Sequence, residues 1–261
     1  GFRAYEDMMA AASDAEPDVV VDPGDPWCFI YTSGTTGNPK GAIRSHRASA
    51  MLSLINNVEM GISRQDTMLL VMPMCHANSL YFGSALTFVG GSNFVYSRKS
   101  FDPEHLLRTL AESAATFTSL VPTQYIRMLA LPDQVRAKCD VSRIQKLMIS
   151  SAPARRDTKL AILDYFRNSG LYELYGSTEG GWATMLHPHD QFDKLGSVGR
   201  ELAGTMPNRL LDANGRDVPE GEVGEIYFSN PYTFDGYWNL PEKTAEAFRG
   251  DYCTVGDLGR R

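Results

Sequence analysis

The sequence predicts an α/β fold, with a mainly parallel sheet flanked by helices and followed by part of an antiparallel β-barrel. Two observations carry this prediction. From residue 27 to about residue 185, short apolar runs alternate with longer helical segments, which is typical of parallel strands joined by crossover helices. Beyond residue 185, turn signals such as Asp212–Gly215 and Pro219–Gly221 separate short strands and leave no room for such helices.

The expected elements follow one another in a regular order. Residues 1–26 are polar and contain Pro17, Pro23 and Pro26, so we expect a surface helix and a linker. Strands are expected at 27–31, 68–72, 93–96, 117–121, 146–150, 171–174, 209–211 and 225–228. Helices are expected at 46–60, 79–89, 102–113, 123–130 and 154–168. Asp102 is the expected N-cap of the third helix, and Gly170 lies just past the last one.

The composition excludes several classes of protein. Of 261 residues 43% are hydrophobic, which is too many for a disordered chain, and the net charge of −6 gives no basic excess for nucleic acid. The four cysteines form no Cys-x-x-Cys pair, so a reducing cytoplasm is the simplest location. Residues 67–97 are uncharged, but Pro73, His76 and Gly90 interrupt them, so we expect no transmembrane segment.

A loop rich in glycine and hydroxyl groups follows the first strand. Residues 31–41 read Tyr-Thr-Ser-Gly-Thr-Thr-Gly-Asn-Pro-Lys-Gly. Glycines let the backbone amides approach a ligand, and hydroxyl groups with one lysine suit a chain of phosphates. The loop is not a Walker A motif, because Pro39 stands where that pattern requires its second glycine. A plain surface loop is the alternative.

This segment resembles the phosphate loop of the adenylate-forming enzymes: acyl-CoA synthetases, luciferases and peptide-synthetase adenylation domains. Three further segments are similar to family motifs and occur in the family's order. Tyr175–Glu179 is similar to Tyr-Gly-x-Thr-Glu, and Gly224–Ile226 with Gly236–Asn239 to the barrel motif. Thr254–Asp257 is similar to Thr-Gly-Asp, with Val255 as an extra residue. The resemblance spans nearly the whole chain from Trp27.

The resemblance implies a nucleotide site. Its expected residues are Thr32, Ser33, Gly34, Thr35, Thr36, Gly37, Lys40, Ser151, Ala152, Pro153, Glu173, Leu174, Tyr175, Gly176, Ser177, Thr178 and Asp257. Tyr175 offers a flat face for adenine, Thr178 a hydroxyl for the α-phosphate, and Asp257 two acceptors for the ribose hydroxyls. Thr35 and Glu179 are the expected Mg²⁺ ligands, since Mg²⁺ takes a carboxylate together with phosphate oxygens.

The acyl side of the site is implied by Met72–Asn78, which resembles the family's Pro-x-x-His segment. His76 is therefore expected to be catalytic, together with Lys40, Thr178 and Glu179; a hydrogen-bonded core histidine is the alternative. No Asp lies between residues 67 and 97 to pair with an ammonium group, so we expect an acid without an α-amine. The segment His187–Asp190 forms no standard metal site.

The implied activity is that of an acid–thiol ligase: ATP activates a carboxylic acid to an acyl-adenylate, and coenzyme A then takes the acyl group. The expected partners are the small-molecule acid, ATP, Mg²⁺ and coenzyme A, with no nucleic acid and with homo-oligomers allowed. The alternatives are a carrier protein or another acceptor in place of coenzyme A, and a non-catalytic nucleotide-binding fragment.

The same resemblance implies a division of the chain. Residues 1–26 are expected to be a linker and helix from a preceding subdomain, 27–185 a nucleotide- and acyl-binding α/β subdomain, and 186–261 a partial β-barrel subdomain. The family's C-terminal lid domain, with its catalytic lysine, is expected to be absent. The last lysine here is Lys243, in an expected loop, so we expect the fragment to be nearly inactive on its own.

Overall fold

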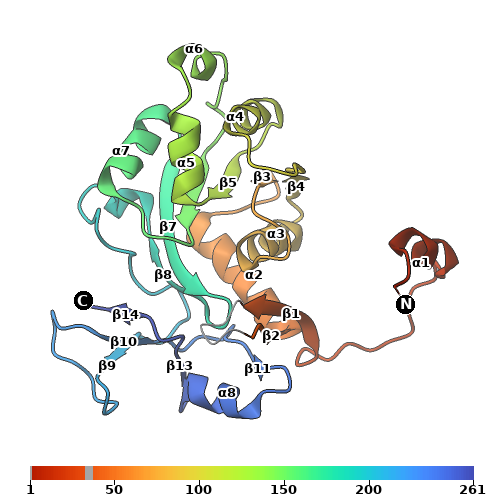
Figure 1. The fold of residues 1–261 in the computed structure, drawn as a ribbon, viewed down its shortest axis with the longest axis vertical. Coiled ribbons are helices and arrows are strands. Elements are labelled where there is room, and N and C mark those ends of the chain that lie inside the picture. Colours follow the sequence, from red (N-terminus) through yellow and green to blue (C-terminus); the bar gives the residue numbers. More distant parts are fainter. Residues whose placement is uncertain (1, 33–37) are drawn as a thin grey trace.

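The computed structural model describes residues 2–32 and 38–261 and confirms the expected α/β class. The main sheet has the order β4 (Ser92–Val95), β3 (Thr67–Leu70), β5 (Phe117–Leu120), β6 (Lys146–Ser150), β7 (Gly170–Ser177) and β8 (Gly181–Leu186) (Figure 1). Neighbouring strands from β4 to β7 are parallel, whereas β7 and β8 are antiparallel. The carboxyl ends of the parallel strands therefore meet at one edge of the sheet.

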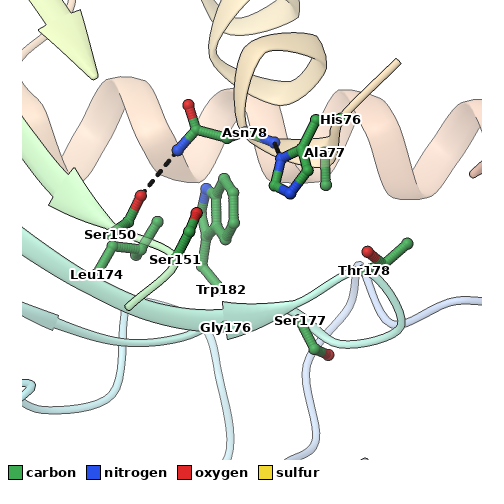
Figure 2. A pocket seen from close by; sticks show the side chains of 10 residues that line it. All are labelled: His76, Ala77, Asn78, Ser150, Ser151, Leu174, Gly176, Ser177, Thr178 and Trp182. Atoms are coloured by element: carbon green, nitrogen blue, oxygen red, sulfur yellow. Dashed lines mark hydrogen bonds between the residues drawn. The ribbon is translucent and has the colours of Figure 1, made fainter. Parts of the chain in front are cut away.

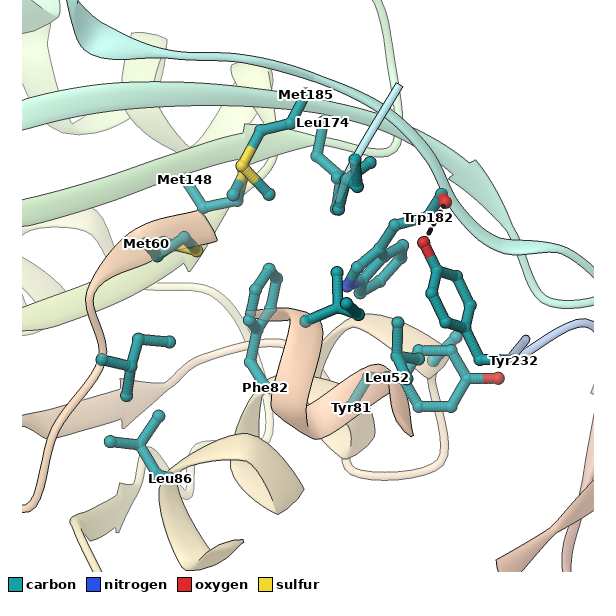
Figure 3. Close-up of a cluster of buried hydrophobic side chains, with 14 of the residues drawn as sticks. Leu52, Met60, Tyr81, Phe82, Leu86, Met148, Leu174, Trp182, Met185 and Tyr232 are labelled. Carbon is teal, nitrogen blue, oxygen red and sulfur yellow. Dashed lines mark hydrogen bonds between the residues drawn. The ribbon is translucent and has the colours of Figure 1, made fainter. Parts of the chain in front are cut away.

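Helices cover both faces of this sheet. One face packs against α2 (His46–Met60) and α3 (Ala77–Val89), and the other against α4 (Pro103–Glu112), α5 (Pro122–Leu129) and α7 (Arg156–Tyr165). The side chains of one strand alternate between the two cores: Met68 and Leu70 belong to the first, and Leu69 to the second. Figure 3 shows the first core, where residues of α2 and α3 meet those of the sheet. Because helices pack on both faces, the edge at which the parallel strands end is held in position.

Capping residues set the ends of the expected helices. Asp102 accepts a hydrogen bond from the backbone N–H of His105 at 3.0 Å, as an N-cap does, and Pro103 fills the first turn of α4. Gly61 ends α2 in the left-handed region at a φ of 59°, which a residue with a Cβ adopts at a cost. The helix expected at 154–168 is shorter, since α7 begins at Arg156 and ends at Tyr165.

Three small antiparallel sheets complete the fold. They have the orders β1 (Pro26–Thr32), β2 (Lys40–Ser45), β11 (Gly236–Tyr237); β14 (Leu258–Gly259), β10 (Gly224–Tyr227), β9 (Arg209–Leu211); and β12 (Phe248–Arg249), β13 (Tyr252–Cys253). The short helical elements are α1 (Tyr5–Ala11), α6 (Asp133–Arg136), η1 (Pro188–Asp190) and α8 (Pro241–Ala247). The pairing of β11 with β2 places the later part of the chain beside the strand that begins at Lys40.

Two local expectations are wrong. Lys243 lies on α8 rather than in a loop, because Pro241 fills the first turn and the alanine- and glutamate-rich residues after it favour a helix. The strand expected to end at residue 174 continues to Ser177 and turns back into β8. Gly181 takes a positive φ of 66° at this reversal.

Candidate active site

The carboxyl edge of the main sheet brings together residues that are far apart in sequence. His76 follows β3, Ser151 follows β6, and Gly176–Thr178 stand at the end of β7 (Figure 2). Between them is a first cavity of about 230 Å³. Its lining residues are His76, Ala77, Asn78, Ser150, Ser151, Leu174, Gly176, Ser177, Thr178 and Trp182.

His76 is placed in the first cavity as a neutral hydrogen-bond donor. It caps α3, and its Nδ1 accepts a hydrogen bond from the backbone N–H of Asn78 at 3.2 Å. A neutral imidazole that accepts at Nδ1 carries its proton on Nε2. Burial lowers the pKa of His76 below its ordinary value of 6.5, which favours this neutral form. The residue therefore suits hydrogen bonding to an anionic oxygen rather than proton removal.

A second cavity of about 490 Å³ adjoins the first. Its lining includes the expected nucleotide residues Ser151, Ala152, Pro153, Glu173, Leu174, Tyr175, Gly176 and Asp257. Ser151, Leu174 and Gly176 line both cavities. The Tyr175 hydroxyl donates a hydrogen bond of 2.9 Å to Oδ2 of Asp257, so β7 is tied to the segment that precedes β14. The other oxygen of Asp257 remains an acceptor for a ligand hydroxyl.

Two residues that line the second cavity have unusual environments. Ser151 has a φ of 66°, a left-handed conformation that is costly for a residue with a Cβ and is concentrated at functional sites. Glu173 is buried, and its carboxylate pairs with Lys159 of α7. Burial raises the pKa of Glu173 although the Lys159 hydrogen bond opposes this rise. The ion pair with α7 engages the Glu173 carboxylate while the residue still lines the cavity.

A third cavity, of about 360 Å³, contains Thr32, Lys40 and Glu179, together with Glu225, Tyr237 and Thr254. Lys40 Nζ donates a hydrogen bond of 3.1 Å to the Tyr237 hydroxyl, which donates one of 2.7 Å to Oε1 of Glu179. The lysine also lies 4.2 Å from the centre of the Tyr237 ring, within the range of a cation–π contact. The hydroxyl of Tyr237 thus stands between the expected phosphate-binding cation and the expected metal ligand.

A buried arginine, which we did not single out from the sequence, holds this region in place. Arg44 of β2 is fully buried, and its guanidinium donates to the carbonyls of Thr178 at 3.3 Å, Glu179 at 3.0 Å and Tyr232 at 2.5 Å. Within residues 2–32 and 38–261, no carboxylate forms an ion pair with it. Ser45, His46 and Arg47 follow Arg44 directly, so nothing in the local sequence indicates that this arginine is buried.

The donor set fits Mg²⁺ when phosphate oxygens complete its shell. Glu179 offers a carboxylate beside the hydroxyls of Thr32 and Thr254, and Mg²⁺ prefers such hard oxygen ligands. The described part of the chain holds no group of three or more His, Cys, Asp or Glu side chains able to bind a metal by themselves. The predictions for Ser33, Gly34, Thr35, Thr36 and Gly37 concern residues outside the described ones.

Comparison with known proteins identifies the family. Residues 2–238 match the sequence profile of the family described as AMP-binding enzyme. The chain belongs to this family of AMP-binding enzymes. The match covers the three cavities except for the residues after Trp238, such as Asp257.

Individual relatives agree with this assignment. The chain is similar to a medium/long-chain-fatty-acid–CoA ligase, FadD8, of Mycobacterium tuberculosis (33% identity over 98% of this chain and 43% of the relative). It is also similar to an indoleacetate–CoA ligase of Aromatoleum aromaticum (31% identity, 100% and 50%). Among solved structures, MatB of Rhodopseudomonas palustris without ligand superposes with a TM-score of 0.85 at 32% identity (98% and 49%). The chain spans about half the length of the curated relatives it matches.

Proposed function

We propose that this chain forms the nucleotide- and acid-binding part of an enzyme that activates a carboxylic acid with ATP and passes the acyl group to coenzyme A. The observation that carries the proposal is the shared wall of the first two cavities, formed by Ser151, Leu174 and Gly176. An acid in the first cavity and an adenosine in the second then meet at this wall, and Thr178 lines the acid side of it. The similarity to the fatty-acid–CoA ligase and the indoleacetate–CoA ligase named above supports the same activity.

The residues have distinct roles in the first step. A carboxylate oxygen of the acid attacks the α-phosphorus, and the bond from that phosphorus to the pyrophosphate oxygen breaks. A carboxylate is already ionised at neutral pH, so no protein base is required. Thr178 and the neutral Nε2–H of His76 hydrogen-bond the reacting oxygens, and Lys40 pairs with the outer phosphates. Glu179 would hold Mg²⁺ together with the phosphates, and the metal would supply charge neutralisation for the pyrophosphate.

In the second step, the sulfur of coenzyme A attacks the acyl carbon of the adenylate, and AMP leaves with the electrons of the broken bond. ATP and coenzyme A are cytosolic metabolites, and Cys28, Cys75, Cys139 and Cys253 are free thiols in the described structure. We therefore also propose a cytoplasmic location. None of the helices in the described residues is both long and apolar enough to cross a membrane.

The proposal is tested by binding and by exchange. Calorimetry on the 261-residue chain should show that a non-hydrolysable acyl-adenylate analogue binds more tightly than AMP, because it fills two cavities. The protein that contains this chain should exchange pyrophosphate into ATP only when an acid is present. Thr178→Val should abolish the exchange, whereas the exposed Thr123→Val should not. Exchange without acid, or equal binding of analogue and AMP, contradicts the proposal.

A further inference from the structure

The first cavity is small for an acyl site. It measures about 230 Å³. This is below the range of about 300–1,000 Å³ of most small-molecule pockets, and a cavity of about 150 Å³ holds one benzene ring. The carboxylate of a substrate takes up part of that space beside Thr178. The rest accommodates a short chain or a single ring, but not a long alkyl chain.

Trp182 is the large side chain in the wall, and it is fixed on several sides (Figure 3). Its Nε1 donates a hydrogen bond of 2.8 Å to Oδ1 of Asn56. The rings of Tyr81 and Phe82 lie 5.4 Å from it, one edge-on and the other stacked. A Cβ at Gly176 would lie 2.9 Å from Cε3 of the indole, so the ring packs against a residue that has no side chain. Moving a ring held in this way would disrupt its close packing and cost free energy.

Much of the remaining wall is polar, although Ala77 and Leu174 also line it. Asn78 and Ser150 are joined by a hydrogen bond of 2.8 Å from Nδ2 to Oγ, and both line the cavity beside Ser151 and Thr178 (Figure 2). Oδ1 of Asn78 is buried and has no hydrogen-bond partner within the described residues. A long alkyl chain against these groups would cover polar atoms and return no hydrogen bonds.

A larger apolar cavity of about 520 Å³ is separate from the first. That cavity lies between α2, α3 and the ends of β3 and β4. Its lining residues are Trp27, His46, Ser49, Ala50, Ser53, Leu70, Met74, Leu80, Gly83, Ser84, Thr87, Phe88, Asn93 and Val95. As described, it shares none of them with the first cavity.

We infer that Trp182 is a specificity-determining residue that restricts the substrate to compact carboxylic acids, with a short chain or a single ring. The inference rests on the proposed function, in which the acid occupies the first cavity. It predicts a substrate class different from the medium- and long-chain acids in the name of FadD8, although that protein is 33% identical.

The test uses acyl-sulfamoyl adenosines, which mimic the acyl-adenylate without reacting, in calorimetric titrations of the 261-residue chain. The acyl groups are acetyl, butanoyl, benzoyl, octanoyl and hexadecanoyl. We expect the three compact analogues to bind at least about tenfold more tightly than the hexadecanoyl analogue. Trp182→Leu should move the preference towards octanoyl. Trp238→Leu, which changes a half-exposed tryptophan outside the cavity, should keep the wild-type order.

Each outcome decides the inference. Wild-type binding of the hexadecanoyl analogue as tight as that of the acetyl analogue overturns it, and so does an unchanged order of preference in folded Trp182→Leu. If the leucine variant does not fold, Trp182→Phe gives the second comparison. The affinities of the five analogues for the wild-type chain test the inference without any variant. Failure of all five analogues to bind overturns the proposed function itself. Tight binding of long analogues overturns only the limit set by Trp182.

Discussion

The hydroxyl of Tyr237 donates a hydrogen bond of 2.7 Å to Oε1 of Glu179. The same hydroxyl accepts a hydrogen bond from Lys40, so a neutral group separates a cation from an anion that would otherwise attract each other. Burial raises the pKa of Tyr237, and the neighbouring Glu179 carboxylate raises it further, so the hydroxyl keeps its proton at neutral pH. The arrangement leaves Lys40 available to phosphates and Glu179 available to a metal ion.

Tyr237→Phe should weaken the binding of Mg·ATP, because Lys40 and Glu179 lose the hydroxyl that separates them. We expect a loss of about 1 kcal/mol, or roughly fivefold in affinity, with little change for AMP. Tyr252→Phe is the control, since that hydroxyl donates only to an exposed backbone carbonyl, at 3.3 Å. Calorimetric titration with each nucleotide measures the difference. Equal ATP affinities for Tyr237→Phe and wild type would remove the proposed role.

Lys40→Ala should weaken ATP more than AMP, since the lysine is proposed to pair with the outer phosphates. A charge-assisted contact of this kind is worth about 1.5–3 kcal/mol. Lys138→Ala removes an exposed positive charge just after α6, which Figure 1 shows at the opposite end of the molecule from β2, and should leave both affinities unchanged. The same titrations apply, and an equal loss for ATP and AMP would place Lys40 away from the outer phosphates.

The alternation of apolar runs made the main sheet predictable as far as β7. Strands such as Lys146–Ser150 and the helix His46–Met60 lie where their local signals place them, because a buried parallel strand and a capped helix are both specified by nearby residues. β8 was not predicted. Its residues Gly181–Leu186 are all buried, so they lack the polar alternation that marks a strand with one solvent face.

The residues of the candidate site that belong to a motif were predictable, whereas those that packing brings together were not. Tyr175, Thr178 and Glu179 lie within five residues of one another, and they are placed together because β7 ends there. Tyr237 was quoted only as part of a barrel motif, and nothing local indicates that β11 pairs with β2 and brings it to Lys40. Such contacts between distant segments depend on the whole fold.

His76→Ala should impair the use of the acid while leaving ATP binding nearly intact, because His76 lines the first cavity and not the second. Its lowered pKa means that the unfolded chain takes up a proton before the native one as the pH falls below 6.5. Native stability from this group therefore decreases towards acid pH, and the alanine variant should lose that dependence. The exposed His189→Ala is the control. Pyrophosphate exchange at several acid concentrations distinguishes weaker use of the acid from weaker binding of ATP. A parallel fall in ATP affinity would show that His76 has a structural role.

Arg44→Met should destabilise the fold, since the guanidinium donates to three backbone carbonyls. The carbonyl of Tyr232 would lose its donor, whereas those of Thr178 and Glu179 would keep the Tyr81 hydroxyl and the Phe234 N–H. One unsatisfied buried carbonyl costs about 1–3 kcal/mol and each of the two other lost hydrogen bonds about 1 kcal/mol, partly offset by the removal of a buried charge, so we expect about 3 kcal/mol. In a chain of this size that lowers Tm by roughly 6–12 °C. The exposed Arg47→Met should change Tm little. Scanning calorimetry of both variants measures the shift in Tm, and an unchanged Tm for Arg44→Met would contradict the prediction.

Asp66→Asn should destabilise the chain at neutral pH but not in acid. Burial by itself would raise the pKa of Asp66, but hydrogen bonds from Lys146 at 2.9 Å, Thr116 at 2.7 Å and the backbone of Ser63 at 2.9 Å outweigh it and hold the pKa below 3.8. A carboxyl with a lowered native pKa contributes stability above 3.8, and this contribution is lost as the pH falls through the native value. We expect the variant to lose about 1–3 kcal/mol at about pH 7, measured by urea unfolding, and the gap to close below about pH 3. Asp164→Asn breaks an exposed ion pair and should cost less than about 1 kcal/mol at either pH. A gap for Asp66→Asn that stays constant from neutral to acid pH would mean that its charge does not stabilise the fold.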